Sequence, residues 1–303
     1  MKNILLIPRI KIHNANALSS PYTIGFPAMT AWLGGVHALE RRLQQTEFDG
    51  VRFKSIAVVC HNIDLQTYKG GGDYVHSIIG TGNPLVPKTK KGNPQNAERP
   101  SFIEEARCHL TVSIIIECEE LGLIDFAEFT ETVDQFIRGR MKFAGGDIFG
   151  ALSAELLEID DKTSQRKLLR RLMPGHCLIE RRDLMKQAMA DGQDGIDAIL
   201  EYLKVTHRCE VDEQEKVKWT SSRKEKGWLV PIATGFHGIT ELGEAKNQRD
   251  PDTPHRFAES VITLGEFVMP YRIDDLDNML WHYHSDLENN LYLCQQKKPV
   301  IQN

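Results

Sequence analysis

The strictest pattern in the chain is an alternation of apolar and polar residues from Arg107 to Ile114. Every second residue from Cys108 onwards is apolar, and the residues between them are polar or charged. Successive side chains of a β-strand point to opposite faces, so this pattern predicts a strand with one buried face and one polar face. The fold must therefore include a sheet that packs on one side.

Two strands and a helix are predicted before this segment. A strand is expected over residues 4–13, because an apolar run there gives way to period-two alternation. Its polar positions share one face and carry Arg9, Lys11 and His13. Pro27 suits the first position of a helix over about 28–45, whose apolar residues recur with a period of about 3.6 residues. A β-rich strand follows at 51–61.

A second helix and a last strand are predicted after the alternating segment. Asp125, with Glu128 three residues later, resembles a helix-capping box in which Asp replaces Ser or Thr. The helix ends near Arg140, and a strand covers part of 147–158. This order predicts the α+β class with a ferredoxin-like (RRM-like) βαββαβ core. We assign that core to residues 1–160.

A long insertion interrupts the core between its two middle strands, at about residues 64–105. Gly and Pro recur too often there for a continuous helix. Lys88, Lys90 and Lys91 make the insertion basic. We expect a protruding, mobile hairpin or loop.

The C-terminal part, residues 161–303, is expected to form a mixed α/β extension packed on the core. Thr253-Pro254 is a good pair of cap and first helical residue, which predicts a helix through about Met269. The other elements predicted there are helices near 164–173, 181–190 and 194–204, a strand from Trp228 to Ile232, and a short helix near 274–284.

Motifs for catalysis or cofactor binding are incomplete in this sequence. The run Gly70-Gly71-Gly72 lacks the lysine and hydroxyl of a phosphate-binding P-loop. The pair Gly145-Gly146 lacks the third glycine of a dinucleotide site. A GxSxG hydrolase motif does not occur. We predict no catalytic residue and no cofactor.

Metal ligands are equally sparse. The six cysteines form no CxxC pair and are interpreted as reduced packing residues. His282 and His284 form an HxH pair close to Asp286, but no distant ligand set accompanies them, so a structural role is favoured over a metal site. Trp32, Trp228 and Trp281 are expected in the core or at an interface.

Charge is unevenly distributed, although the net charge is only −5. Residues 1–43 and 164–186 are basic, whereas 117–134 carry only acids. This asymmetry suits one basic groove and one acidic outer face, although each run taken alone is also typical of a solvated helix face. Apolar runs are too short for a membrane span or a signal peptide, so we expect a cytoplasmic protein without membrane contact.

The loop after the first strand is a candidate nucleic-acid site. It places small and amide residues between a basic strand and the start of a helix, including Asn14, Asn16, Ser19 and Ser20. Backbone N–H groups and amide side chains there are suited to hold a phosphodiester chain and to read base edges. The alternative is an ordinary turn rich in Asn and Ser.

Several short blocks carry a family resemblance. They run in order from residue 4 to residue 284, and only 64–105 and 190–225 match poorly. Together they resemble the second-subunit family of the Csy complex, the type I-F CRISPR surveillance complex (Cascade). The blocks are Leu6-Ile7-Pro8-Arg9, Asn14-Ala15-Asn16-Ala17, Ser19-Ser20-Pro21, Gly25-Phe26-Pro27, Val36-His37-Ala38-Leu39, Glu105 to Leu110, Met141 to Gly146, Arg170 to Gly175, Gly227 to Ile232, Thr253 to Phe257 and Leu280 to His284.

The resemblance implies a ferredoxin-like fold of the repeat-associated RNA-binding superfamily, with a protruding thumb at 64–105 or near 190–225. It implies a non-catalytic subunit that binds the 5′ handle of CRISPR RNA. Such a subunit pairs with the large Cascade subunit as a heterodimer and caps the backbone filament. It would meet target DNA only through the complex, in RNA-guided antiviral defence.

The residues expected to contact the RNA combine cations, amides, hydroxyls and glycines. Lys and Arg would neutralise phosphates, and Asn and Ser would read splayed bases. Arg170 and Arg171 are as well explained by a solvated helix face, and Gly145 and Gly146 by a helix-terminating turn. The full set is Arg9, Asn14, Asn16, Ser19, Ser20, Arg107, Lys142, Gly145, Gly146, Arg170 and Arg171.

Two other functions stay open at this point. One is a metal-independent, CRISPR RNA-processing endoribonuclease of the same superfamily, with a histidine such as His37 as general base. The other is an interaction protein that packs on the large subunit and never touches RNA.

Overall fold

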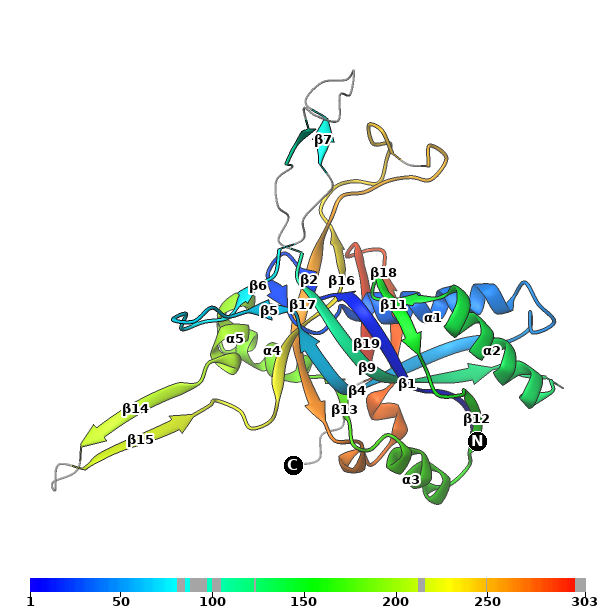
Figure 1. The fold of residues 1–303 in the computed structure, drawn as a ribbon, viewed down its shortest axis with the longest axis horizontal. Coiled ribbons are helices and arrows are strands. Elements are labelled where there is room, and N and C mark those ends of the chain that lie inside the picture. Colours follow the sequence, from blue (N-terminus) through cyan, green and yellow to red (C-terminus); the bar gives the residue numbers. More distant parts are fainter. Residues whose placement is uncertain are drawn as a thin grey trace.

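A computed structural model describes residues 1–80, 85–87, 97–99, 105–122, 124–211, 216–248 and 250–297. Within these ranges, eleven strands form one antiparallel sheet and five α-helices pack around it (Figure 1). The predicted α+β class is confirmed. None of the described helices is long and apolar enough to cross a membrane.

The strands of the first half of the chain form one side of this sheet. β1 and β9 pair along their length, β4 lies on the other edge of β9, and both β11 and β12 pair with the other edge of β1. β10 extends this edge beyond β11. The bounds are β1 Lys2–Asn16, β4 Arg52–Leu65, β9 Arg107–Glu119, β10 Lys142–Phe143, β11 Gly146–Gly150 and β12 Glu155–Ile159.

Two helices connect these strands and cover one face of the sheet. α1 (Met29–Leu43) precedes β4, and α2 (Phe126–Arg140) follows β9. α2 begins at Asp125, whose carboxylate accepts from the backbone N–H groups of Ala127 and Glu128, as the sequence indicated. The apolar side chains between the helices and the sheet include the fully buried Trp32, Phe129 and Phe143.

The second half of the chain continues the same sheet. β13 pairs with β4, and β17, β16, β19 and β18 follow in that order. β18 also pairs with β4 through Trp281 and Ile56, so this part of the sheet curls back on β4. The bounds are β13 His176–Glu180, β16 Leu229–Gly238, β17 Ala258–Val268, β18 Trp281–Asp286 and β19 Leu291–Gln296.

The remaining helices lie near the predicted positions. α3 (Lys162–Arg171) and the 3-10 turns η2 (Pro270–Arg272) and η3 (Leu276–Met279) cover the second face of the sheet over the first residues of β1. α4 (Arg182–Ala190) and α5 (Gly195–Leu203) form a smaller apolar cluster against β16 and β17.

Two predicted helices are wrong. The segment after Thr253-Pro254 forms strand β17, because its residues pair in the sheet with both β13 and β16, and this long-range pairing outweighs the local capping signal. The segment 274–284 contains only the turn η3 before strand β18 begins at Trp281.

The burial of the tryptophans and cysteines agrees with the sequence except at Cys209. Trp32 and Trp281 are core residues, whereas half of the Trp228 surface is exposed, which leaves an interface as its predicted place. Five of the six cysteines are free and buried, as expected of packing residues. Cys209 is exposed, because β14 carries it away from the sheet.

Two-stranded hairpins project from the sheet (Figure 1). The longest pairs β14 (Thr206–Val211) with β15 (Val217–Ser222), and nearly every residue of it is exposed. The described residues of the 64–105 insertion include two short hairpins, and its lysines at 88, 90 and 91 lie outside the described residues. The short pairs are β2 (Leu18–Ser20) with β3 (Thr23–Ile24), β5 (Thr67–Tyr68) with β6 (Ser77–Ile78), and β7 (Val86–Pro87) with β8 (Ala97–Glu98).

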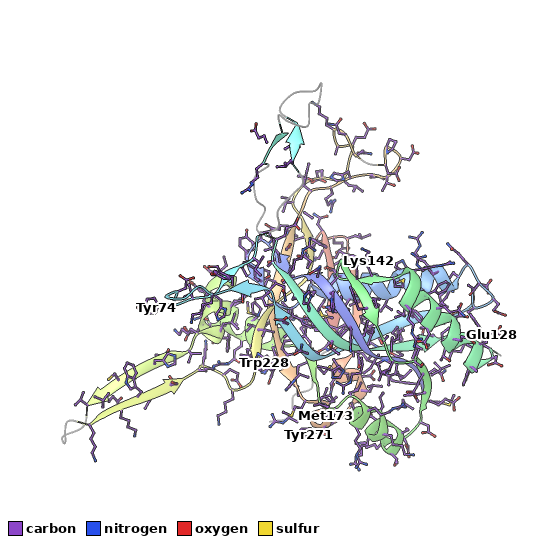
Figure 2. The ribbon with its side chains drawn as sticks, in the orientation of Figure 1. Tyr74, Glu128, Lys142, Met173, Trp228 and Tyr271 are labelled. Atoms are coloured by element: carbon purple, nitrogen blue, oxygen red, sulfur yellow. The ribbon has the colours of Figure 1, made fainter. Side chains whose placement is uncertain are left out.

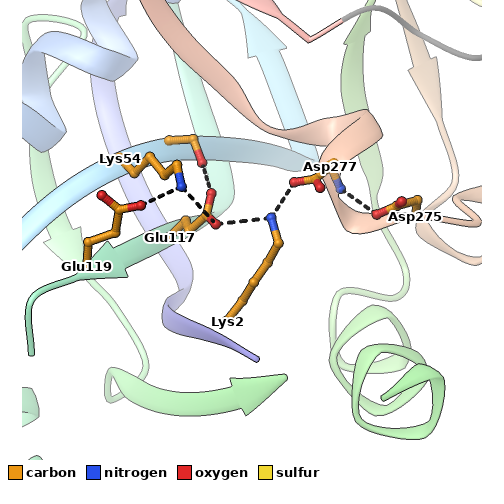
Figure 3. Close-up of polar contacts among 7 residues, drawn as sticks. Lys2, Lys54, Glu117, Glu119, Asp275 and Asp277 are labelled. Atoms are coloured by element: carbon orange, nitrogen blue, oxygen red, sulfur yellow. Dashed lines mark hydrogen bonds and ion pairs between the residues drawn. The ribbon is translucent and has the colours of Figure 1, made fainter. Parts of the chain in front are cut away.

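An ion-pair network fastens the start of the chain to the sheet (Figure 3). The Lys2 ammonium contacts Glu117 of β9 at 3.0 Å and also pairs with Asp277 of η3. The Glu117 carboxylate accepts from the Ser55 hydroxyl at 2.6 Å and lies 3.9 Å from the Lys54 ammonium. These contacts join β1, β4, β9 and η3 at one end of the sheet.

Candidate nucleic-acid interface

An open groove lies between the first half of α1 and the ends of β1, β9 and β10. Its volume is about 730 Å³. It brings together five of the residues that the sequence singled out: Asn16, Ser19, Arg107, Lys142 and Gly145. Figure 2 labels Lys142, which marks this end of the sheet. The other lining residues are Leu18, Pro27, Ala28, Ala31, Gly34, Gly35, Ala38, Glu105 and Ala144.

The helix side of the groove has no long side chains. Ala28, Ala31, Gly34, Gly35 and Ala38 recur at spacings of three to four residues, so they share one face of α1. A Cβ added at Gly34 would meet no atom within 4 Å, which shows that this face is open. A ligand in the groove can therefore approach the helix backbone closely.

The N-terminus of α1 opens onto the same groove. The capping residue is Ala28, which offers no side-chain hydrogen bond, and the first turn contains no acid. The first N–H groups of a helix have no partner within the helix, and the helix dipole places partial positive charge there. An uncapped N-terminus of this kind favours an anion such as a phosphate.

Two cations form the opposite wall. The Arg107 guanidinium pairs with Glu105, and the Lys142 ammonium lies 2.7 Å from the Asp147 carboxylate. Both members of the Lys142 pair are more than half exposed. Exposed ion pairs contribute only about 0–1 kcal/mol, so a phosphate can replace Asp147 at little cost.

Amide and hydroxyl groups complete the rim. The Asn16 side chain is held by Leu18, whose N–H donates to Oδ1 at 3.1 Å and whose carbonyl accepts from Nδ2 at 3.1 Å. The Ser19 hydroxyl lies 2.8 Å from the Thr23 hydroxyl. The Asn16 N–H donates to Ala144 O at 2.8 Å, which holds the turn before Gly145 against the end of β1.

The two glycines of this turn differ. Gly145 has a φ of +76°, which few other residues adopt, and a Cβ there would meet open space. At Gly146 a Cβ would come within 2.6 Å of the Ile12 side chain and 2.7 Å of His13 O. Gly145 thus borders the groove, whereas Gly146 allows β11 to pack tightly on β1.

Six predicted residues lie outside the groove lining, Gly146 among them. Arg9 sits at a bulge of β1 with a φ of 54°, and its guanidinium donates to Met173 O at 2.9 Å. Ser20 is buried, and its hydroxyl lies 2.7 Å from the Thr23 hydroxyl. Asn14 is exposed at the end of β1, and Arg170 and Arg171 are exposed at the end of α3. Arg171 pairs there with Glu155.

His37, the candidate general base, faces away from the groove. Its Nδ1 lies 3.1 Å from the Glu40 carboxylate, and both residues line a separate cavity of about 80 Å³. The groove lining contains no histidine or cysteine. Within the described residues, no cluster of three or more His, Cys, Asp or Glu is placed to hold a metal ion.

Sequence reasoning missed the contribution of α1. The signal was present, because alanine and glycine recur at helical spacing from Ala28 to Ala38. Such a stripe is also typical of close helix packing, and Gly35 does serve that purpose against Phe143. Only the three-dimensional structure separates the two roles.

Comparison with known proteins gives the class and then the family. The chain is a CRISPR-associated protein: residues 5–294 match the family model described as CRISPR-associated protein (Cas_Csy2). It is 34% identical to the CRISPR-associated protein Csy2 of Pseudomonas aeruginosa (strain UCBPP-PA14), over 95% of this chain and 94% of that protein. The chain therefore belongs to the Csy2 family and is a subunit of a type I-F CRISPR Csy complex. The resemblance drawn from the sequence is confirmed.

Proposed function

We propose that this subunit binds the 5′ handle of CRISPR RNA in the groove beside α1. One observation carries the proposal: the groove joins an uncapped helix N-terminus to Lys142, in an exposed ion pair, and to Arg107, in a half-buried one. Partial positive charge on one wall and full charges on the other suit a phosphodiester chain.

Different groups of the groove would contact the phosphates and the bases of the handle. Arg107, Lys142 and the first turn of α1 contact phosphates and supply an affinity that falls with salt. Asn16 and Ser19 lie on the rim, where their polar atoms suit the exposed base edges of single-stranded RNA. Gly145 and the small face of α1 admit the strand close to the backbone.

The fold supports the same assignment. In the part formed by residues 1–160, the four principal strand segments lie in the order fourth, first, third, second, with a helix in each crossover. This is the order of a ferredoxin-like sheet, and we assign that core accordingly, with 161–303 as its extension. The exposed β14–β15 hairpin supports the 190–225 region as the thumb.

The subunit acts by capture and positioning, without catalysis. Within the Csy complex it would pair with the large subunit and cap the backbone filament. Target DNA would then be bound by the assembled complex and not by this subunit alone. The groove lining contains no histidine, and the carboxylate of its one acid, Glu105, is paired with Arg107, which favours binding over RNA cleavage.

The test is binding of an RNA that carries the constant 5′ sequence of the neighbouring CRISPR transcripts. Arg107→Glu should weaken binding of this RNA to the full-length chain, whereas Arg107→Lys should retain most of it. The bound RNA should keep its full length on incubation. Equal affinity of the Arg107→Glu variant and the native chain would contradict the proposal.

A further inference from the structure

Three aromatic rings form a stack on the open face of the sheet. The His13 ring of β1 lies between Phe149 of β11 and His109 of β9. The ring centroids of His13 and Phe149 are 4.1 Å apart with an interplanar angle of 18°, and those of His13 and His109 are 4.6 Å apart with an angle of 28°. The stack thus crosses three neighbouring strands.

A backbone hydrogen bond fixes the orientation of this stack. The Asn14 N–H donates to His109 Nδ1 at 3.1 Å. Asn14 adopts a φ of 54°, a left-handed conformation that an asparagine tolerates better than most residues. Because Nδ1 accepts this bond, the His109 ring is held in one plane and one tautomer. The rings are therefore organised before any ligand arrives, which reduces the entropy lost on binding.

The stack is not part of the core. The opposite face of these strands carries the buried Ile12 and Leu110. On the face of the stack, α3 and η3 cover the first residues of β1, but Phe149 keeps 69% of its surface exposed. An apolar ring left in water at the end of an ordered stack offers a flat surface to another flat group.

Two cations lie on the same strand as His13. Lys11 is exposed two residues before His13, and Arg9 precedes it on the same strand. Within the described part of the chain neither pairs with a carboxylate, and the Arg9 guanidinium donates to the Met173 carbonyl. Two acids are register partners of the stacked histidines: Asp147, which pairs with Lys142, lies opposite His13, and Asp64 lies opposite His109.

The stack is continuous with the groove. Arg107 lines the groove two residues before His109, and its Nη1 approaches Asn14 O at 3.5 Å. On the other side, Asp147 is the register partner of His13 and the ion-pair partner of Lys142. A strand that passes between Arg107 and Lys142 therefore arrives at the ring stack.

We propose that a base of the single-stranded RNA stacks on Phe149, while Lys11 and Arg9 contact its phosphates. This inference rests on the proposed function, because it extends the path of the same RNA out of the groove. Stacking on an aromatic side chain contributes about 1–3 kcal/mol per base, so loss of the Phe149 ring should weaken binding roughly 5- to 150-fold.

The experiment measures affinity of a fluorescent single-stranded RNA with the constant 5′ sequence for four variants of the full-length chain. Phe149→Leu should show the loss, and Phe149→Trp should bind as tightly as the native chain. Lys142→Ala tests whether the RNA binds in the groove, and it should weaken RNA binding. Tyr271→Leu is the matched control, because Tyr271 is 61% exposed on η2, beside α3 (Figure 2). The same set is repeated with single-stranded DNA.

Each outcome separates the two proposals. If the native chain does not bind the RNA, the proposed function fails and the inference fails with it. If Lys142→Ala weakens binding but Phe149→Leu matches Tyr271→Leu, only the stacking inference is overturned. If the native chain binds single-stranded DNA of the same sequence as tightly as the RNA, the ligand is not specifically RNA, and that assignment is withdrawn.

Discussion

Gly35 of α1 lies directly against the ring of Phe143 in β10, so that a Cβ at Gly35 would come within 2.5 Å of the Phe143 Cδ1 atom. Phe143 is fully buried, and its ring stacks near Trp32. The ring therefore has no room to retreat. This contact sets the distance between α1 and the strand that leads into the Gly145 turn.

Gly35→Ala should consequently destabilise the protein. The overpacked Phe143 ring should cost about 1–3 kcal/mol of unfolding free energy. Gly34→Ala is the matched control, because a Cβ at Gly34 meets nothing within 4 Å. Alanine is the better helix former by up to about 1 kcal/mol, so this variant should be as stable as the native chain or more stable. Urea unfolding of both variants measures the difference, and equal stabilities would contradict the described packing.

Gly34→Leu should block the groove without unfolding the chain. The leucine side chain would project into the space that the RNA is proposed to occupy, so affinity should fall by about tenfold or more, equivalent to ~1.4 kcal/mol. Gly139→Leu is the control, because Gly139 is an exposed glycine in α2 with the same open surroundings. Unchanged RNA affinity of a folded Gly34→Leu variant would place the RNA elsewhere.

Lys142→Ala should change how binding depends on salt. For single strands, each phosphate contact contributes about 0.7 to the slope of log affinity against log salt concentration. The variant should lose about that amount, because one cation of the groove is gone. Lys186→Ala removes an exposed cation of α4, away from the groove, and should leave the slope unchanged. Parallel salt titrations of the two variants make the comparison.

Glu117 should make stability depend on pH in the acidic range. Burial alone would raise the pKa of its carboxyl group, but the Ser55 hydroxyl and the Lys2 and Lys54 ammonium groups outweigh burial and lower that pKa below its ordinary value of 4.5. The stabilisation is therefore fully present above about pH 4.5 and is lost as the pH falls through the lowered value in the folded state.

Glu117→Gln should remove this acid-sensitive contribution. It should cost about 1–2 kcal/mol at neutral pH, since the lysines of the network are partly exposed. Urea midpoints measured from neutral pH to below pH 4.5 test the prediction. If the native chain and the variant lose stability in parallel across this range, the carboxylate does not hold the ends of β1, β4 and β9 together.

Local signals in the sequence predicted much of the fold. The alternation from Cys108 to Ile114 belongs to β9, and the carboxylate of Asp125 caps α2. Thr253-Pro254 predicted a helix that does not form, because a helix-capping pair describes only where a helix could begin. The pairing of β17 with β13 and β16, which decides the conformation, involves residues far away in the chain.

The candidate site was predictable only in part. Asn16, Ser19, Arg107 and Lys142 could be listed from residue type and family resemblance, but their convergence needs the pairing of β1 with β9 and β11. The stack of His13 on Phe149 also depends on register, and a shift of one residue would place the two rings on opposite faces.

The most direct test of the central claim is the RNA that the protein carries from cells. The tagged full-length chain would be co-purified with the products of its neighbouring genes, and the bound RNA would be sequenced. The account predicts one dominant small RNA with a constant 5′ end, depleted when Arg107→Glu replaces the native chain. A purified complex that contains this chain and retains the same RNA despite Arg107→Glu, or that carries no such RNA, would contradict it.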